Sequence, residues 1–192
     1  MSSLIDARPA RLRDTEFFAM VESGAFGDRR VYLWNGRLCE KMAKSTQHAF
    51  VNERISRAVR ALLPDTWETW HENPVHLGRW HVPLPDFAVV RGPLDRYRDR
   101  GPEPADVGLV VEVAVTSLKA DLGKRADRYA QFGVPSYWVA DVGKGQIVEH
   151  RRLVVTAGVA SYGDVRRLGA SDEVELALGG AAVGRIPMTD IF

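Results

Sequence analysis

The chain has 192 residues, of which 45% are hydrophobic, which is enough for one packed core, so a single domain is expected. A net charge of +1 excludes a strong whole-molecule field for nucleic acid, so any basic surface must be local. The single cysteine, Cys39, excludes an internal disulfide and a cysteine-based zinc site, which fits a reducing compartment. No stretch has the apolar run of a signal peptide or a membrane span, which predicts a cytoplasmic protein.

The first third of the chain predicts an arm, a hairpin and a helix. Residues 1–14 are polar and basic, typical of a flexible N-terminal arm before one domain at 15–192. Residues 30–42 alternate around Asn35-Gly36, which is a strong signal for a two-residue β-hairpin. Apolar residues recur at helical spacing over 46–62, and Pro64 ends that predicted helix.

Two buried strands follow, and each is associated with a carboxylate. Residues 87–90 form an apolar strand that begins beside Asp86. After a charged excursion at 91–106, residues 107–115 form an apolar run that contains one carboxylate, Glu112. A buried carboxylate requires a cation, a metal or hydrogen-bond donors, so Glu112 is either functional or part of a structural salt bridge near a strand end.

The second half predicts a parallel unit within a mixed sheet. Residues 118–132 have a helical apolar stripe, ended by Gly133 and Pro135, and residues 137–142 form the next short strand. A strand, helix and strand with short links make the 107–115 and 137–142 strands parallel neighbours. Later strands are expected within 147–155 and 161–174, which gives an α/β fold with a mixed sheet.

Asp86 and Glu112 are candidates for a metal site. If their strands are neighbours, the two carboxylates lie together at one end of the sheet and offer hard oxygen ligands for Mg²⁺ or Mn²⁺, with water completing the coordination shell. Such a site catalyses hydrolysis by activating water and by screening the charge of a phosphate.

The helix at 118–132 contributes a cation. Arg125 falls on the stripe formed by Leu122 and Tyr129, which directs its guanidinium toward the sheet that carries Glu112. Lys124 points about a hundred degrees away on an ideal helix, but its side chain is long enough to reach a phosphate. The alternative is a structural Arg125 that extends from the core edge or pairs with Glu112.

Several motifs together resemble one family. Leu84-Pro85-Asp86, Val111-Glu112-Val113-Ala114, Asp121-Leu122-Gly123-Lys124-Arg125 and the segment Tyr129 to Trp138 resemble the Uma-two family of putative restriction endonucleases, in the PD-(D/E)XK nuclease superfamily. The segment from Asn35 to Met42 and His48 resemble it as well. The resemblance covers roughly residues 15–192, and it implies a restriction-endonuclease-like mixed sheet flanked by helices, with an N-terminal hairpin.

The resemblance also implies roles for residues. Asp86 and Glu112 would bind the metal, and the backbone carbonyl of Val113 would add a ligand. The superfamily's lysine two residues after the Glu is replaced here by Ala114, so the cation comes from the helix, where Arg125 aligns with the family's lysine and Lys124 is its neighbour. Two further departures are Tyr32 and Val115, which stand where the family often has Glu and Asp.

These observations predict an Mg²⁺- or Mn²⁺-dependent endonuclease that hydrolyses phosphodiester bonds of DNA. Lys124 or Arg125 would orient the water and the scissile phosphate, and the arginines of residues 91–100 would contact backbone phosphates. PD-(D/E)XK enzymes that cut both strands often dimerise, so the resemblance implies a homodimer as one expected assembly. The alternative is a non-catalytic member of the fold that binds nucleic acid or a protein.

Overall fold

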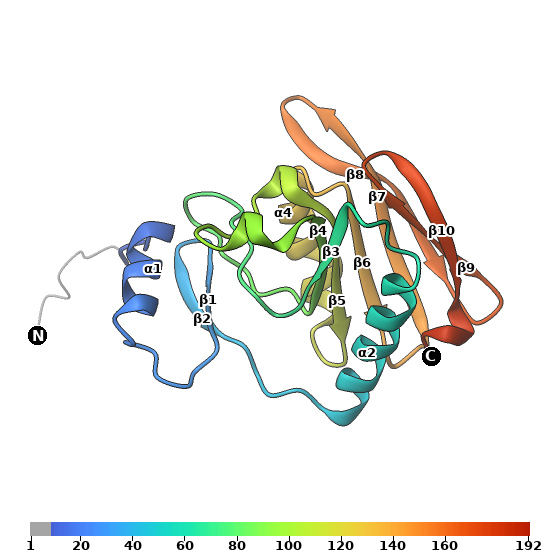
Figure 1. The fold of residues 1–192 in the computed structure, drawn as a ribbon, viewed down its shortest axis with the longest axis horizontal. Helices are drawn as coiled ribbons and strands as arrows, with labels where there is room; N and C mark the ends of the chain where they lie inside the picture. Colours follow the sequence, from blue (N-terminus) through green and yellow to red (C-terminus); the bar gives the residue numbers. More distant parts are fainter. Residues whose placement is uncertain (1–8) are drawn as a thin grey trace, which may run out of the picture.

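The structure is a computed structural model that describes residues 9–192, and a six-stranded mixed sheet forms its centre (Figure 1). Neighbouring strands are antiparallel except β5 and β6, which are parallel as predicted. In spatial order the strands are β3 (Trp67–Trp70), β4 (Phe87–Arg91), β5 (Val107–Ala114), β6 (Ser136–Asp141), β7 (Gln146–Thr156) and β8 (Val159–Leu168). The predicted α/β class and mixed sheet are therefore confirmed.

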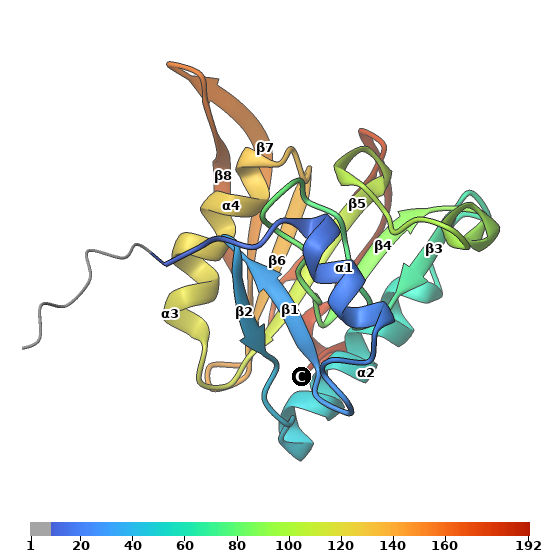
Figure 2. The same ribbon diagram turned by 90° about the vertical axis from the view of Figure 1, so that its left-hand side faces the viewer.

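Strand β5 lies inside the sheet, between β4 and β6, and every one of its residues is buried. Alternate side chains of a strand point to opposite faces. Val111 and Val113 pack with α2 (Thr46–Arg60) and with the separate hairpin of β9 (Glu173–Leu178) and β10 (Ala181–Pro187). Val110 and Ala114 pack on the other face, against α4 (Ala126–Gln131), and Figure 2 shows α2 and α4 on opposite sides of the strands. Glu112 therefore belongs to the α4 face.

Helix α2 confirms the helix predicted at 46–62. Its N-cap Ser45 accepts a hydrogen bond from the backbone N–H of His48 at 3.2 Å. Val51, Ile55 and Val59 form its buried side. The Ser45 cap and this packing together fix the position of His48, which lies in the first turn of the helix.

The continuous helix predicted at 118–132 is wrong. The segment consists of α3 (Leu118–Ala120), a π-helical turn called η3 (Asp121–Arg125) and α4. At Gly123 the backbone leaves helical geometry, with φ −106° and ψ −109°. Glycine is a poor helix former, so the interruption falls at the position with the weakest helical preference.

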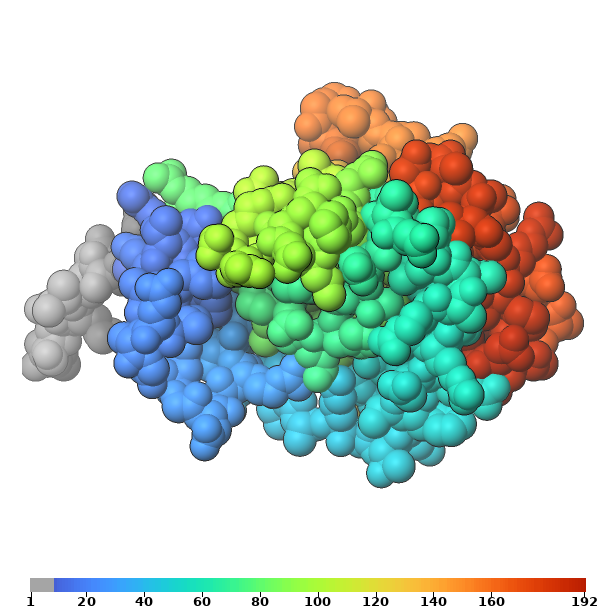
Figure 3. Space-filling view, in the orientation of Figure 1, coloured from blue at the N-terminus to red at the C-terminus, as the bar shows by residue number. Residues whose placement is uncertain are grey.

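The predicted N-terminal hairpin is confirmed as β1 (Val31–Trp34) and β2 (Arg37–Glu40), which form a two-stranded sheet of their own. Its turn residues Asn35 and Gly36 have φ values of 54° and 72°, as a type I′ turn requires. In the space-filling view, this N-terminal region (blue) lies at the end of the molecule opposite β9 and β10 (red) (Figure 3).

The predicted flexible arm falls partly outside the described residues, which begin at residue 9. The part that is described contacts the hairpin. Arg11 Nη2 donates to the side chain of Asn35 at 2.8 Å, and the Leu12 N–H donates to the Gly36 carbonyl at 2.9 Å. Helix α1 (Asp14–Glu22) follows and buries Phe17.

The remaining elements are short 3₁₀ turns at Leu94–Tyr97, Pro104–Asp106 and Met188–Asp190. Among residues 9–192, no helix combines the length and the apolar composition that crossing a membrane requires.

Candidate active site

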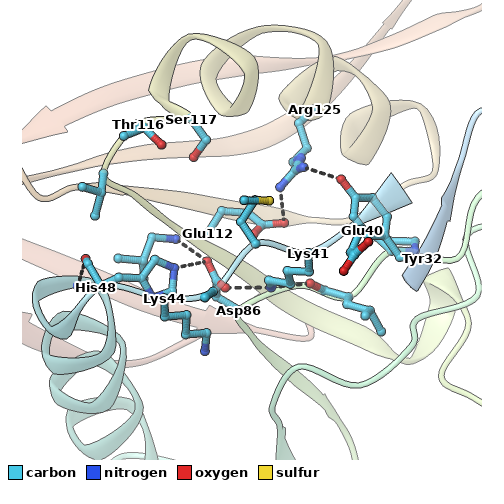
Figure 4. A pocket seen from close by; sticks show the side chains of 17 residues that line it. Tyr32, Glu40, Lys41, Lys44, His48, Asp86, Glu112, Thr116, Ser117 and Arg125 are labelled. Atoms are coloured by element: carbon cyan, nitrogen blue, oxygen red, sulfur yellow. Dashed lines mark hydrogen bonds and ion pairs between the residues drawn. The ribbon is translucent and has the colours of Figure 1, made fainter. Parts of the chain in front are cut away.

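A cavity of about 350 Å³ lies where the hairpin, the start of α2, η3 and the ends of β4 and β5 meet (Figure 4). Most of its functional groups come from segments far apart in the sequence. They are Tyr32, Glu40, Lys41, Lys44, His48, Asp86, Glu112, Thr116, Ser117 and Arg125.

The structure brings Asp86 and Glu112 to this cavity from neighbouring strands. Strands β4 and β5 are antiparallel, with Phe87 opposite Val111, so the next position along each strand places Asp86 opposite Glu112. Each residue is 3% exposed, and both line the cavity. The two carboxylates therefore form one candidate site at the edge of the sheet.

Asp86 is surrounded by donors. Lys41 Nζ lies 2.7 Å from Oδ1, while His48 Nε2 lies 3.0 Å from Oδ2 and the Val113 N–H donates to Oδ2 at 2.8 Å. Burial alone would raise the pKa of Asp86, but the hydrogen bond from His48 and the charge of Lys41 outweigh burial and hold this pKa well below its ordinary value. Asp86 is therefore a carboxylate at neutral pH.

Glu112 has a different environment. Arg125 Nη1 lies 3.1 Å from Oε1, and the Tyr129 hydroxyl donates to the same oxygen at 3.0 Å. Burial raises the pKa of Glu112 to about 7, against the opposing effect of Arg125 and with a further contribution from the charge of Asp86. Both contacts are made by the same carboxylate oxygen, Oε1.

Arg125 holds Glu112 from η3. Its Nη1 also lies 3.3 Å from Asp121 Oδ1, and its Nη2 donates to the Tyr32 hydroxyl at 3.4 Å. The charge of Glu112 raises the pKa of Arg125 above its ordinary value, so the guanidinium stays charged. Lys124 is exposed and does not line the cavity. Of the two predicted cations, only Arg125 contacts a candidate metal-binding carboxylate.

Two residues at Asp86 were not assigned a role from the sequence, although both lie in segments that carried the family resemblance. Lys41 follows β2, and His48 lies in the first turn of α2. Because the hairpin is not hydrogen-bonded into the main sheet, no local pattern places Lys41 against Asp86. The sequence signal that could have indicated them is their position: Lys41 directly follows the predicted hairpin, and His48 lies at the start of the predicted helix.

The phosphate contacts expected of the 91–100 arginines stay a prediction, and the position of this segment does not favour them. These residues follow β4 at the end remote from Asp86, since β4 runs from Phe87 to Arg91. Arg96 and Arg100 instead pair with the buried Asp106 at 3.3 and 2.7 Å. Charge counts alone could not show at which end of the sheet this segment lies.

The donor set fits a hard divalent cation. The part of the chain that the structure describes contains no group of three or more His, Cys, Asp and Glu residues that could hold a metal ion. A cation here would bind Asp86, Glu112 and the Val113 carbonyl, with water at the other positions. Mg²⁺ commonly uses one or two carboxylates and keeps several waters, so this small set is sufficient.

The six-stranded mixed sheet flanked by helices defines a restriction-endonuclease-like fold. The model of the Uma2 (Uma-two) family, described as "putative restriction endonuclease", matches residues 15–182, so the chain belongs to this family. The family resemblance seen in the sequence is thus confirmed.

A solved structure has the same fold. It is the crystal structure of a putative nuclease belonging to DUF820 from Anabaena variabilis ATCC 29413, with a TM-score of 0.69 and 13% sequence identity. The match covers 96% of this chain and 98% of that chain. None of the curated proteins compared with the chain matches it.

Proposed function

We propose that this protein is a divalent-metal-dependent endonuclease that hydrolyses phosphodiester bonds of DNA, with a PD-(D/E)XK-type site. The observation that carries the proposal is the pair of Asp86, which directly precedes β4, and Glu112 of β5, both at one cavity. Membership of a family described as "putative restriction endonuclease" supports this reaction class. The single cysteine is compatible with action in the cytoplasm.

In this proposal, Asp86, Glu112 and the Val113 carbonyl hold Mg²⁺ or Mn²⁺. When bound, such a cation supplies positive charge to a phosphate and lowers the pKa of water. The protein's own part is to present an ionised Asp86 through its low pKa and to orient Glu112 through Arg125 and Tyr129. Arg125 also adds a fixed positive charge beside the phosphate.

The reaction is hydrolysis. The oxygen of a water molecule bonds to phosphorus as the water loses a proton, one phosphoester bond breaks, and the leaving oxygen takes up a proton. Positive charge at the cavity stabilises the charge that develops on the phosphoryl oxygens. Because the net charge of the whole chain is only +1, we assign phosphate binding to cations at the cavity.

A non-catalytic binding function is the second candidate, and one observation favours it. Asp86 is already paired with Lys41 and His48, and Glu112 is paired with Arg125. Ion pairs of this kind also stabilise buried carboxylates that have no catalytic role.

Calorimetric titration with Mn²⁺, together with plasmid cleavage, tests the proposal. We expect the wild-type protein to bind Mn²⁺ and to nick supercoiled DNA, and we expect Asp86→Ala to lose both properties. Asp95→Ala is a matched control, because its carboxylate is exposed and remote from the cavity, and it should behave as wild type. Absence of Mn²⁺ binding at millimolar metal would favour the non-catalytic function.

A further inference from the structure

Lys41 lines the candidate active site and contacts one of its two central carboxylates, Asp86. Its side chain is 15% exposed, and Nζ lies 2.7 Å from Asp86 Oδ1. The same Nζ donates to the carbonyl oxygen of Leu84 at 2.6 Å. The Lys41 N–H donates to the Arg30 carbonyl at 2.8 Å, which ties the backbone of Lys41 to the start of the hairpin.

The other cations near the cavity have different partners. Arg125 is bound to Glu112, Asp121 and Tyr32. Lys44 pairs with Glu72. Within residues 9–192, Lys41 is thus the one lysine whose ammonium touches Asp86 or Glu112. Figure 4 shows Lys41 beside Asp86, across the cavity from Arg125.

We propose that Lys41 is a catalytic residue, whose ammonium group contacts the scissile phosphate and the attacking water during hydrolysis. This inference rests on the proposed endonuclease function. It assigns the lysine of the active site to the position that directly follows the N-terminal hairpin, while Arg125 of η3 orients Glu112. The hairpin thereby supplies part of the catalytic machinery.

The physical argument concerns what happens when a divalent cation shares Asp86. Two cations at one carboxylate repel each other, so the ammonium group gives up its close contact with Oδ1. The backbone of Lys41 keeps its place, because its hydrogen bond to Arg30 does not involve the site. A phosphate oxygen at the cavity then offers the ammonium a new anionic partner, and lysine binds phosphate as a compact point charge.

The competing role for Lys41 is that of a counter-ion for Asp86 in the metal-free protein. The two roles differ when metal is saturating. A divalent cation then neutralises Asp86, so a mere counter-ion is dispensable, whereas an ammonium that contacts the phosphate is still required.

The test compares Lys41→Met, which keeps length and removes charge, with Lys41→Arg, which keeps charge and changes shape. Lys119→Ala is the control, since Lys119 is exposed on α3 and does not line the cavity. Single-turnover cleavage of supercoiled plasmid is measured at saturating Mn²⁺. Mn²⁺ affinity is measured by calorimetry without DNA, and folding is checked by thermal melting.

We expect Lys41→Met to reduce the cleavage rate about a hundredfold, as loss of one charge-stabilising donor typically does. Its affinity for Mn²⁺ should be equal or higher, because a like charge beside Asp86 has been removed. Lys41→Arg should reduce the rate about tenfold, since a planar guanidinium cannot take the place of the compact ammonium. Lys119→Ala should cleave as wild type does.

A wild-type rate for Lys41→Met at saturating Mn²⁺ would overturn the inference. If Asp86→Asn were inactive in the same assay, the proposed function would still stand; if Asp86→Asn also cleaved, both would fail. Much weaker Mn²⁺ binding in a folded Lys41→Met would also overturn the inference, because Lys41 would then act by organising Asp86. Should Lys41→Met not fold, Lys41→Arg decides: a wild-type rate overturns the inference and a tenfold loss supports it.

Discussion

Asp86 and Glu112 are equally buried, yet the pKa of one is lowered and the pKa of the other is raised. The difference lies in their donors. Asp86 receives hydrogen bonds or charge from Lys41, His48 and the Val113 N–H, which together outweigh burial. Glu112 has Arg125 as its charged partner, and burial prevails. The pair thus combines one carboxylate that is ionised at neutral pH with one whose charge depends on its surroundings.

We expect Glu112→Gln to abolish metal-dependent plasmid cleavage while leaving the protein folded. Gln keeps an oxygen that accepts from Tyr129 and Arg125, and Arg125 retains Asp121, so no buried cation is left without a partner. A neutral amide is a poor ligand for Mg²⁺, and the site would lose one of its two carboxylates. Cleavage assays test the loss of activity, and thermal melting tests whether the variant is folded. Persistent cleavage in this variant would place the activity at another site.

The pKa of Glu112 predicts a pH-dependent stability in the metal-free protein. Its folded-state pKa of about 7 lies above the ordinary value of 4.5, so the folded state binds this proton more tightly than the unfolded state does. The resulting stabilisation is fully present below pH 4.5 and is lost as pH rises through 7. The unfolding free energy of Glu112→Gln minus that of wild type should therefore increase by on the order of 3 kcal/mol as pH rises from below 4.5 to above 7. Urea unfolding with a chelator at pH 5 and pH 8 measures this difference, and an equal difference at both pH values would contradict the raised pKa.

A third prediction separates the two neighbouring cations on η3. Lys124→Ala should leave the cleavage rate within about twofold of wild type, because surface changes away from the site have small effects. Arg125→Ala should reduce it about a hundredfold, since Glu112 loses the donor that orients it. Arg125→Lys should be intermediate, because an ammonium can pair with Glu112 but cannot also reach Asp121 and Tyr32. An inactive Lys124→Ala beside an active Arg125→Ala would reverse these assignments.

At the scale of elements, the hairpin β1–β2 lines the candidate site through Tyr32 and Glu40. It is not hydrogen-bonded into the main sheet as a strand pair, but it carries Tyr32 to Arg125 and is followed by Lys41 at Asp86. Arg11 and Leu12 hold its turn from outside. Because the turn joins β1 to β2, a shift of the turn would shift the strands that carry Tyr32 and precede Lys41.

Gly36→Ala should reduce both stability and cleavage. Gly36 has φ +72°, and an added Cβ would lie 2.8 Å from Arg11 Cβ, so the turn must shift. We expect the unfolding free energy to fall by about 1 kcal/mol, because Ala disfavours this backbone conformation. We also expect the cleavage rate to fall about tenfold, because side chains at the site are misplaced. Gly158→Ala is the matched control, with φ +79° in the β7–β8 turn and open space around its Cβ. It should lose similar stability and keep wild-type cleavage at a temperature where both variants are folded.

The sequence was sufficient to predict the elements that have a regular spacing of apolar residues and a clear terminating residue. Strand β5, helix α2 and the Asn35-Gly36 hairpin follow from apolar spacing and turn residues. The π-helical turn at Asp121–Arg125 was missed because the apolar stripe continues through Gly123. The docking of the hairpin over Asp86 was missed because it depends on tertiary contacts between residues more than forty positions apart.

At the scale of the whole molecule, basic and acidic residues are nearly equal in number. Two charged segments nevertheless lie far apart. The candidate active site and the arginines of residues 91–100 lie at opposite ends of β4, a strand of five residues. A strand rises about 3.3 Å per residue, so roughly 16 Å separate these two ends. Sequence composition could show that both segments are charged, but it could not show which of them faces the candidate site.

The last prediction tests this separation through the salt dependence of DNA binding. Binding of a DNA duplex is measured over a range of salt concentrations, with Ca²⁺ in place of Mg²⁺ to slow cleavage. Lys44→Ala should weaken binding and reduce the slope of log affinity against log salt by about one, since each lost phosphate contact removes about one released counterion. Lys44 lines the cavity, although it also pairs with Glu72. Arg98→Ala should change neither quantity, because the Arg98 side chain is 75% exposed and lies in the segment at the far end of β4. The reverse result would move the DNA-binding surface to residues 91–106, and DNA would then have to span both ends of the sheet to reach Asp86 and Glu112.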